Sequence, residues 1–222
     1  MRVLAIAAHP DDETLGAGGT LLKHARDGDE MHWLIVTQPD PNDWATEVVS
    51  QCLAQVKSVG AAYGFKEVVE LGLPAARLDQ VPRRETVDAV TRVIRNIRPE
   101  RIYTVGETDA HTDHLITFEA LMLACKTSRA ELGSTAVYAY EVLSSTEAAL
   151  GWNGQVFVPN TYSDIEPFME RKLEIMNLYQ NQLQLDPLPR SSESIKALAR
   201  YRGTGIGLAY AEAFRLVRQI LP

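Results

Sequence analysis

The sequence contains few cysteines, no excess of positive charge and no long apolar run. Its two cysteines, Cys52 and Cys125, are too far apart to suggest a disulfide framework or a zinc-binding pair, so we expect free thiols in a reducing cytoplasm. Lysine and arginine number 22 against 29 aspartates and glutamates, which gives a net charge of -7. This balance argues against a nucleic-acid partner, which needs a basic face, and against docking on an anionic membrane surface.

Membrane-spanning and targeting segments are also missing from the pattern. No apolar stretch approaches the roughly 20 residues of a spanning helix. The apolar run at residues 3–8 is too short for a signal peptide, and no small-residue cleavage site follows it. We therefore expect a cytoplasmic protein without a membrane partner. The length favours a single domain, residues 1–222, and leaves a homo-oligomer as an open alternative.

Apolar, strand-like runs alternate with amphipathic, helix-like ones over most of the chain. We expect strands at residues 2–8, 31–37, 67–73 and 101–105, and helices at residues 14–26, 46–63, 82–97 and 114–127. This alternation predicts an α/β, Rossmann-like fold, with a mostly parallel sheet and helices on both faces. Beyond residue 130 we expect strands at 136–142 and 155–158 and helices at 167–182 and 191–201.

Two short polar segments follow the first and fourth expected strands. They are residues 8–13, Ala-His-Pro-Asp-Asp-Glu, and residues 111–114, His-Thr-Asp-His. Three of the five histidines fall within them. Because open α/β sheets bind ligands at the carboxyl ends of their strands, we expect both segments to contribute to one site.

These residue types suit a catalytic zinc ion, which takes three nitrogen or oxygen ligands and leaves one position for water. His9 and Asp12 can bind one ion from a single turn, and either His114 or His111 can supply the third ligand. Asp11 then stays free to take a proton from the attacking water.

Each feature also has a plainer interpretation. Residues 11–12 could serve simply as a helix cap, with no metal role. His111 and His114, three residues apart, could be surface histidines. Their coincidence with His9 at one end of the sheet favours the metal site. We interpret His24 and His32 as structural, since one lies near a helix end and the other within a strand.

A glycine-rich stretch follows the first polar segment. A dinucleotide-binding fingerprint would need glycine at positions 16, 18 and 21, but position 21 is leucine. We therefore interpret Gly16, Gly18 and Gly19 as positions of close backbone packing near the metal.

The two polar segments together resemble the paired signature of the PIG-L/LmbE-like family of zinc-dependent de-N-acetylases. Further segments resemble parts of that family in the same order: residues 73–78, 157–160, 162–165, 172–182 and 202–214. The resemblance covers nearly the whole chain and implies an LmbE-like fold. It implies three ligands for one Zn²⁺ per chain: His9, Asp12 and His114. It also implies that Asp11 is the general base, that His111 steadies the oxyanion or donates a proton, and that Asp113 orients His111.

The reaction implied by the resemblance is removal of an N-acetyl group from an N-acetylglucosamine-type sugar or sugar conjugate, with a small N-acetylated molecule as partner. Substrate-binding residues stay unassigned. The sequence departs from the family at Cys52, where many members carry arginine, at Gln55, where an acid is common, and at residues 38–44, where a glycine-bearing loop is usual. Trp44 could stack on a sugar face or be buried in packing.

Two alternatives remain open. One, which the departures at residues 38–44 and Cys52 suggest, is a zinc amide hydrolase that acts on a non-sugar or thiol-conjugate amide. The other is a non-catalytic, Rossmann-like module that binds a nucleotide or sugar without metal.

Overall fold

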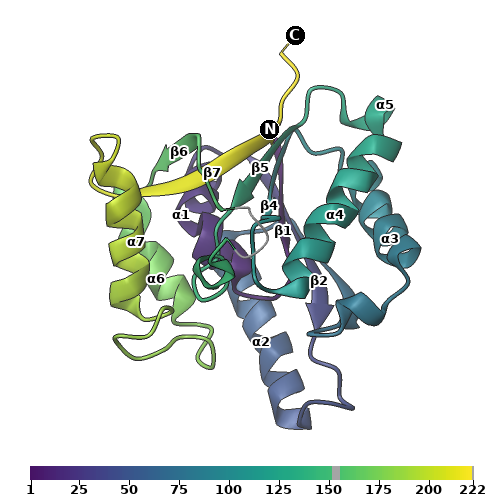
Figure 1. The fold of residues 1–222 in the computed structure, drawn as a ribbon, viewed down its shortest axis with the longest axis horizontal. Coiled ribbons are helices and arrows are strands. Elements are labelled where there is room, and N and C mark those ends of the chain that lie inside the picture. The colour runs from purple at the N-terminus through teal and green to yellow at the C-terminus, as the bar shows by residue number, and fades with distance from the viewer. Residues whose placement is uncertain (152–155, 222) are drawn as a thin grey trace.

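Seven strands form one sheet in the described part of this computed structural model, residues 1–151 and 156–221 (Figure 1). The strands are β1 (Arg2–Ala7), β2 (Glu30–Gln38), β3 (Glu67–Pro74), β4 (Arg101–Val105), β5 (Ala136–Tyr140), β6 (Thr161–Asp164) and β7 (Ala211–Arg218). Their order across the sheet is β3-β2-β1-β4-β5-β7-β6. The first five are parallel, whereas β7 runs antiparallel to both β5 and β6. The predicted mostly parallel α/β architecture is therefore confirmed.

Helices cover both faces of this sheet (Figure 1). They are α1 (Asp12–Arg26), α2 (Thr46–Tyr63), α3 (Arg83–Ile97), α4 (Thr112–Thr127), α5 (Arg129–Leu132), α6 (Met169–Met176) and α7 (Ser192–Thr204). Buried side chains of α1, α2, α6 and α7 share one hydrophobic core, and those of α3, α4 and α5 share the other. Among the described residues, no helix is both long and apolar enough to cross a membrane.

The sequence of the central strand β1 is apolar without alternation because both faces of the strand are buried. Val3, Ala5 and Ala7 face one core, and Leu4 and Ile6 face the other, all with no exposed surface. A parallel strand covered on both faces favours apolar side chains at every position. The first polar residues of the chain's interior therefore come where β1 ends, at the edge of the sheet.

β1 lies where the strand order reverses: β2 and β3 follow it on one side of the sheet, and β4 and β5 lie on the other. β1 pairs with β2 on one side and with β4 on the other. The loops that leave β1 and β4 consequently turn to opposite faces, which opens a crevice between them. Both polar segments of the sequence begin in this crevice.

Close packing holds α1 against the sheet beside the crevice. A Cβ atom at Gly16 would lie 2.1 Å from a ring carbon of Tyr140, and one at Gly19 would lie 2.7 Å from Ile165. Tyr140 is fixed in turn by the hydrogen bond that its hydroxyl donates to the Ile6 carbonyl, at 2.8 Å. The expectation of close packing at these glycines is confirmed, because only a residue without a side chain fits there.

The structure differs from the sequence-based expectation in the last third of the chain. The expected strand at 155–158 is absent at residues 156–158, and residue 155 lies outside the described residues. The strand β6 begins instead at Thr161, after Pro159, which has no N–H to donate to a ladder. The expected helix at 167–182 ends at Met176. Strand β7 has no counterpart among the expected elements.

Candidate active site

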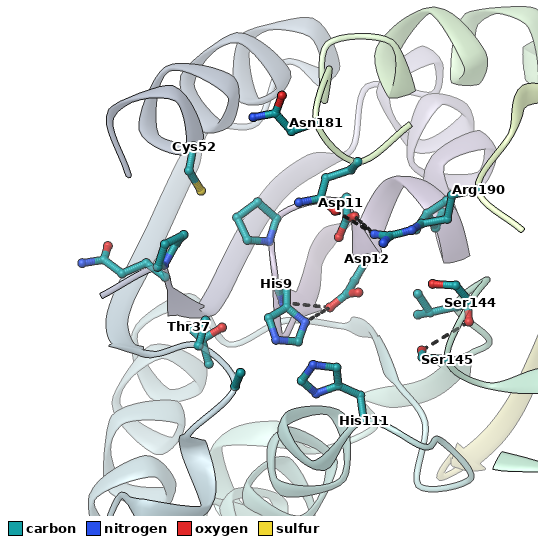
Figure 2. A pocket seen from close by; sticks show the side chains of 18 of the residues that line it. His9, Asp11, Asp12, Thr37, Cys52, His111, Ser144, Ser145, Asn181 and Arg190 are labelled. Atoms are coloured by element: carbon teal, nitrogen blue, oxygen red, sulfur yellow. Dashed lines mark hydrogen bonds and ion pairs between the residues drawn. The ribbon is translucent and has the colours of Figure 1, made fainter. Parts of the chain in front are cut away.

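The two polar segments meet at the carboxyl edge of the sheet. His9 follows β1, and α1 begins at Asp12. His111 is the N-cap of α4, and His114 lies in the first turn of that helix. Figure 2 shows His9, Asp12 and His111 around one pocket, so the structure brings the predicted residues together.

Three of these side chains form a tight cluster. His9 Nδ1 lies 3.2 Å from His114 Nε2. Asp12 Oδ1 lies 3.3 Å from His114 Nε2, and Asp12 Oδ2 lies 3.6 Å from His9 Nδ1. Asp12 is held in place by its own turn, since Oδ2 also accepts a hydrogen bond from the His9 backbone N–H at 2.8 Å. Two ring nitrogens and a carboxylate therefore point at one small volume.

Each of the two imidazoles has a second carboxylate behind it. His9 Nε2 lies 2.9 Å from Asp113 Oδ2, and His114 Nδ1 lies 3.1 Å from Asp109 Oδ2. The hydrogen bond with Asp113 favours a proton on His9 Nε2, and the negative charge of Asp109 favours a proton on His114 Nδ1, which leaves the lone pair of each ring on the opposite nitrogen. These lone pairs belong to His9 Nδ1 and His114 Nε2, the two atoms that face one another.

This arrangement fits a bound cation. Two lone pairs 3.2 Å apart repel each other unless a shared proton or a metal cation lies between them. Although burial opposes it, Asp113 and Asp12 raise the pKa of His9 to about 9. Burial also lowers the pKa of His114, but Asp12 and Asp109 outweigh it and raise that pKa to about 10. The cluster therefore attracts positive charge, and nitrogen and oxygen donors of this kind are those that zinc takes.

The location of Asp113 differs from the role that the resemblance implies. Its carboxylate faces His9, with Asp113 Oδ2 2.9 Å from His9 Nε2, and it accepts hydrogen bonds from the backbone N–H groups of Ala76 at 2.7 Å and Leu78 at 3.1 Å. The reason is local geometry: Asp113 lies one residue into α4, so its backbone N–H, and not its side chain, faces the N-cap. That N–H donates to His111 Nδ1 at 3.2 Å.

His111 also lies within reach of the cluster. The nitrogens of His9, His111 and His114 lie within 4.8 Å of one another, so a three-histidine ligand set competes with the set that contains Asp12. Because His111 Nδ1 accepts the Asp113 N–H, its neutral ring carries the proton on Nε2. The Asp12 carboxylate, which faces both converging lone pairs, is the better placed third donor.

Asp11 lies next to the cluster in a strained backbone conformation. Its φ angle is 118°, a region that non-glycine residues rarely adopt, so the surrounding contacts must hold it there. Arg190 Nη1 donates to Asp11 Oδ2 at 3.1 Å (Figure 2), and the Asp11 backbone N–H donates to Glu13 Oε2 at 3.2 Å. Burial and the neighbouring Asp12 carboxylate raise the pKa of Asp11 to about 7, although Arg190 opposes this.

The Glu13 carboxyl group, which accepts the Asp11 backbone N–H, is itself held by a buried hydrogen-bond network. Glu13 has no exposed surface, and its Oε1 accepts hydrogen bonds from the Tyr179 hydroxyl at 2.8 Å and the Thr14 hydroxyl at 2.5 Å. Tyr63 from α2 donates to the Thr14 hydroxyl at 3.0 Å. Side chains from three separate parts of the chain therefore fix the conformation around Asp11.

A cavity of about 520 Å³ opens above the cluster. Its floor contains the predicted residues His9, Asp11, Asp12, His111 and His114. Its walls come from the loop after β2, the first turns of α2, residues 142–145 and three residues between α6 and α7, namely Asn181, Gln182 and Arg190. This volume is in the range of small-molecule sites.

Two residues of this site were not singled out by the sequence. Asp109, which lies behind His114, is an acid two residues before His111, and that proximity is a signal that could have indicated it. Arg190 comes from the segment before α7, 179 residues away from Asp11, and no local pattern points to it.

Comparison with known families agrees with the site. The model of the PIG-L family, described as GlcNAc-PI de-N-acetylase, matches residues 4–125, which include both histidine-bearing segments.

The chain belongs to the PIG-L family.

Curated relatives of this PIG-L chain include several deacetylases. It is 28% identical over 136 residues to the uncharacterized deacetylase YaiS of Escherichia coli, a match that covers 59% of the chain and 71% of YaiS. It is 26% identical over 232 residues to the diacetylchitobiose deacetylase of Thermococcus kodakarensis, with 97% and 83% covered. A match to the 1D-myo-inositol 2-acetamido-2-deoxy-alpha-D-glucopyranoside deacetylase of Rhodococcus erythropolis, at 28% identity, covers 62% of the chain but only 55% of that protein.

Solved structures share the fold of this PIG-L chain. The N,N'-diacetylchitobiose deacetylase of Pyrococcus horikoshii superposes with a TM-score of 0.78 at 22% identity, over 97% of the chain and 83% of that protein. The 4-carboxy-2-hydroxymuconate hydratase GalB of Pseudomonas putida superposes with a TM-score of 0.77 at 18% identity, over 100% and 98%. At these identities the likeness shows the fold alone, and a fold that includes a hydratase does not decide the reaction.

Proposed function

We propose that this protein is a zinc-dependent deacetylase that hydrolyses the N-acetyl group of an N-acetylglucosamine-type sugar or sugar conjugate. The observation that carries the proposal is the pair of imidazoles backed by Asp113 and Asp109, whose lone pairs converge beside Asp12. Membership of a family of de-N-acetylases and the deacetylase relatives support the reaction class.

The residues that would hold the ion are His9, Asp12 and His114. Bound there, zinc supplies a Lewis acid that polarises the amide carbonyl of the substrate. The cavity floor then presents the acetamide group to Asp11 and His111, which lie on the same floor. The chemistry left to the protein is to move protons and to stabilise the charge of the transition state.

Asp11 is the residue that we assign to the first proton. Its carboxyl lines the cavity without being one of the three clustered donors, so it can accept a proton from the attacking water. Arg190 fixes one carboxyl oxygen, and the Glu13 network fixes the backbone. A base held in one orientation needs no rearrangement when water attacks.

His111 is assigned to the oxyanion. Because its Nδ1 accepts the Asp113 N–H, the proton on Nε2 is available for a negative oxygen. Hydrogen-bond donors aimed at developing charge commonly contribute a factor of about 10²–10³ to kcat. The leaving nitrogen takes its proton from Asp11 or His111 and departs as a free amine, with acetate as the other product.

The experiment that tests this function measures bound metal and released amine on the same protein. The purified chain is reconstituted with zinc, analysed for metal content and incubated with N-acetylglucosamine, diacetylchitobiose and an N-acetylglucosaminyl inositol. We expect about one zinc ion per chain and amine release that a chelator abolishes and zinc restores. A reconstituted protein that binds no metal would refute the enzyme assignment.

Three variants separate the assigned roles. Asp12→Ala should lose zinc, because it removes one of three ligands. Asp11→Asn and His111→Ala should keep zinc near one per chain, while kcat falls roughly 10²–10⁴-fold for Asp11→Asn. Asp27→Asn, the same change at an exposed carboxyl at the end of α1, is the matched control and should alter neither quantity. Loss of zinc from His111→Ala with retention in Asp12→Ala would support the three-histidine ligand set instead.

Arg190 gives an independent check on the orientation of Asp11. Arg190→Ala should lower kcat while zinc content stays near one per chain, because only the hydrogen bond to Asp11 and the one to Gln182 at 2.7 Å are removed. Arg190→Lys, which keeps the charge but not the planar fork, should recover part of the loss. Equal kcat in the alanine variant and the unsubstituted protein would show that Asp11 needs no such support.

A further inference from the structure

One wall of the cavity is mostly apolar and partly open to solvent. Pro39 and Trp44 from the loop after β2 and Val48 and Cys52 from α2 supply its apolar side chains, and Gln38 and Gln55 from the same part of the chain also line the cavity. Trp44 is 43% exposed, although a tryptophan buries a large apolar area when it can. Figure 2 shows Cys52 across the pocket from His111. These wall residues and the metal cluster line the same cavity.

Ion pairs hold the loop that carries Trp44. Arg77 Nη2 lies 2.8 Å from Asp40 Oδ2 and also pairs with Asp43. The Asp40 carbonyl accepts the backbone N–H groups of Asp43 and Trp44, each at 2.9 Å. The backbone position of Trp44 is therefore defined by contacts within the fold.

The same arginine ties this wall to the cluster below it. Arg77 lies between Ala76 and Leu78, whose backbone N–H groups hold the Asp113 carboxylate. Ala76 itself lines the cavity. The apolar wall and the residues that orient His9 thus belong to one connected structure.

The charge around the wall is unfavourable for an anion. Arg190 is the one lysine or arginine among the described residues that line the cavity, and it is already engaged with Asp11 and Gln182. Burial raises the pKa of the Cys52 thiol to about 11, and Glu70 and Asp11 add to this shift, so the thiol stays neutral. A phosphate or carboxylate placed here would give up part of its hydration without gaining a positively charged partner.

We propose that Trp44, Val48 and Cys52 form a subsite for an uncharged aromatic or alkyl group attached to the N-acetylated sugar, and that Arg77 holds this subsite in place. The proposal rests on the proposed function, because the subsite and the metal cluster share one cavity. It predicts that neutral glycosides are the preferred substrates and that phosphorylated or carboxylated conjugates are not.

The kinetic test compares N-acetylglucosamine, its phenyl β-glycoside and its 1-phosphate. We expect kcat/KM to be roughly 3- to 10-fold higher for the phenyl glycoside than for the free sugar, as aromatic contact is usually worth, and lowest for the phosphate. Trp44→Ala should bring the ratio of phenyl glycoside to free sugar close to one, and Trp44→Phe should restore most of it. Arg77→Gln should lower the same ratio, because it releases the loop.

Tyr201→Ala is the matched control. Tyr201 is an aromatic residue of α7 that is 69% exposed and does not line the cavity, so this variant should keep the ratio. A kcat/KM for the 1-phosphate equal to or above that of the phenyl glycoside would overturn the proposal. A ratio that Trp44→Ala leaves unchanged would do the same.

A binding measurement separates failure of the subsite from failure of the deacetylase assignment. Phenyl β-D-glucosaminide, the amine product, is titrated into the zinc-loaded protein by calorimetry, with glucosamine and glucosamine 1-phosphate as comparisons. Tighter binding of the phenyl compound that Trp44→Ala removes supports the subsite even if no acetyl group is released. Deacetylation without any preference for the phenyl compound in binding or turnover overturns the subsite and leaves the function standing.

Discussion

The buried pair of Lys172 and Glu212 allows a quantitative prediction about how the C-terminal part of the chain supports the site. Lys172 on α6 is 3% exposed, and its ammonium group lies 2.8 Å from Glu212 Oε1 and donates to the Leu15 carbonyl at 2.8 Å. Glu212 on β7 accepts the backbone N–H groups of Gly19 at 2.7 Å and Thr20 at 2.8 Å. One ion pair therefore fastens α6 and β7 to α1, the helix that begins at the metal cluster.

Lys172→Met removes the positive partner and leaves a carboxylate buried in the core. Breaking a buried pair from one side typically costs about 3–5 kcal/mol. Total stabilities of proteins are about 5–15 kcal/mol, so a large fraction would be lost. With a urea slope of about 2–3 kcal/mol/M, the unfolding midpoint should fall by roughly 1–2.5 M.

The assay is urea unfolding followed by circular dichroism, with the variant and the unsubstituted protein at the same pH. Lys196→Met is the matched control: Lys196 pairs with Glu170 at 2.6 Å, but both side chains reach solvent, so its midpoint should move far less. Adding Glu212→Gln to Lys172→Met should restore part of the stability, because it removes the uncompensated charge. Equal midpoints for Lys172→Met and Lys196→Met would refute the reasoning.

Three further predictions concern other contacts around the site. Asp109→Asn removes the negative charge that faces His114 Nδ1. Zinc affinity, measured by competition with a chromophoric chelator, should therefore fall roughly 10–100-fold, and unchanged affinity would contradict this role. Gly16→Ala places a methyl group against the Tyr140 ring and should lower the free energy of unfolding by about 1–3 kcal/mol in a denaturant titration; no change would mean that the ring moves aside. Burial lowers the pKa of His24, so the folded protein binds that proton less readily than the unfolded chain, whose histidine titrates near 6.5. Stability should therefore be intact above about pH 6.5 and decline as pH falls below it, and His24→Gln should flatten that decline.

Local patterns in the sequence were sufficient for the first half of the fold. The predicted bounds of α2 and β4 agree with the structure at both ends. Gly64 ends α2 with a φ angle of 74°, a conformation that suits glycine, so the helix end is encoded at one position. The helices expected at 14–26 and 114–127 begin two residues earlier in the structure, at Asp12 and Thr112, since the polar motif itself forms their first turns.

The antiparallel strands β6 and β7 were harder to predict from the sequence. Strand β7 joins the sheet by pairing with β5 and β6, so its partners lie tens of residues away in the chain. Its residue Glu212 is buried only because Lys172, 40 residues earlier, neutralises it. A buried acid inside a strand contradicts local propensity, and only the tertiary contact that satisfies it makes the strand acceptable.

The sequence alone predicted that His9, Asp12 and His114 would lie at one site, because they follow strands whose carboxyl ends must share an edge of the sheet. Which carboxylate faces which histidine was decided by the tertiary structure. Asp113 faces His9 from 104 residues away, Asp109 faces His114, and Arg190 reaches Asp11 across 179 residues. Hydrogen bonds act over about 3 Å and depend on orientation, so their partners are chosen by the packing of whole helices and strands and not by neighbours in the chain.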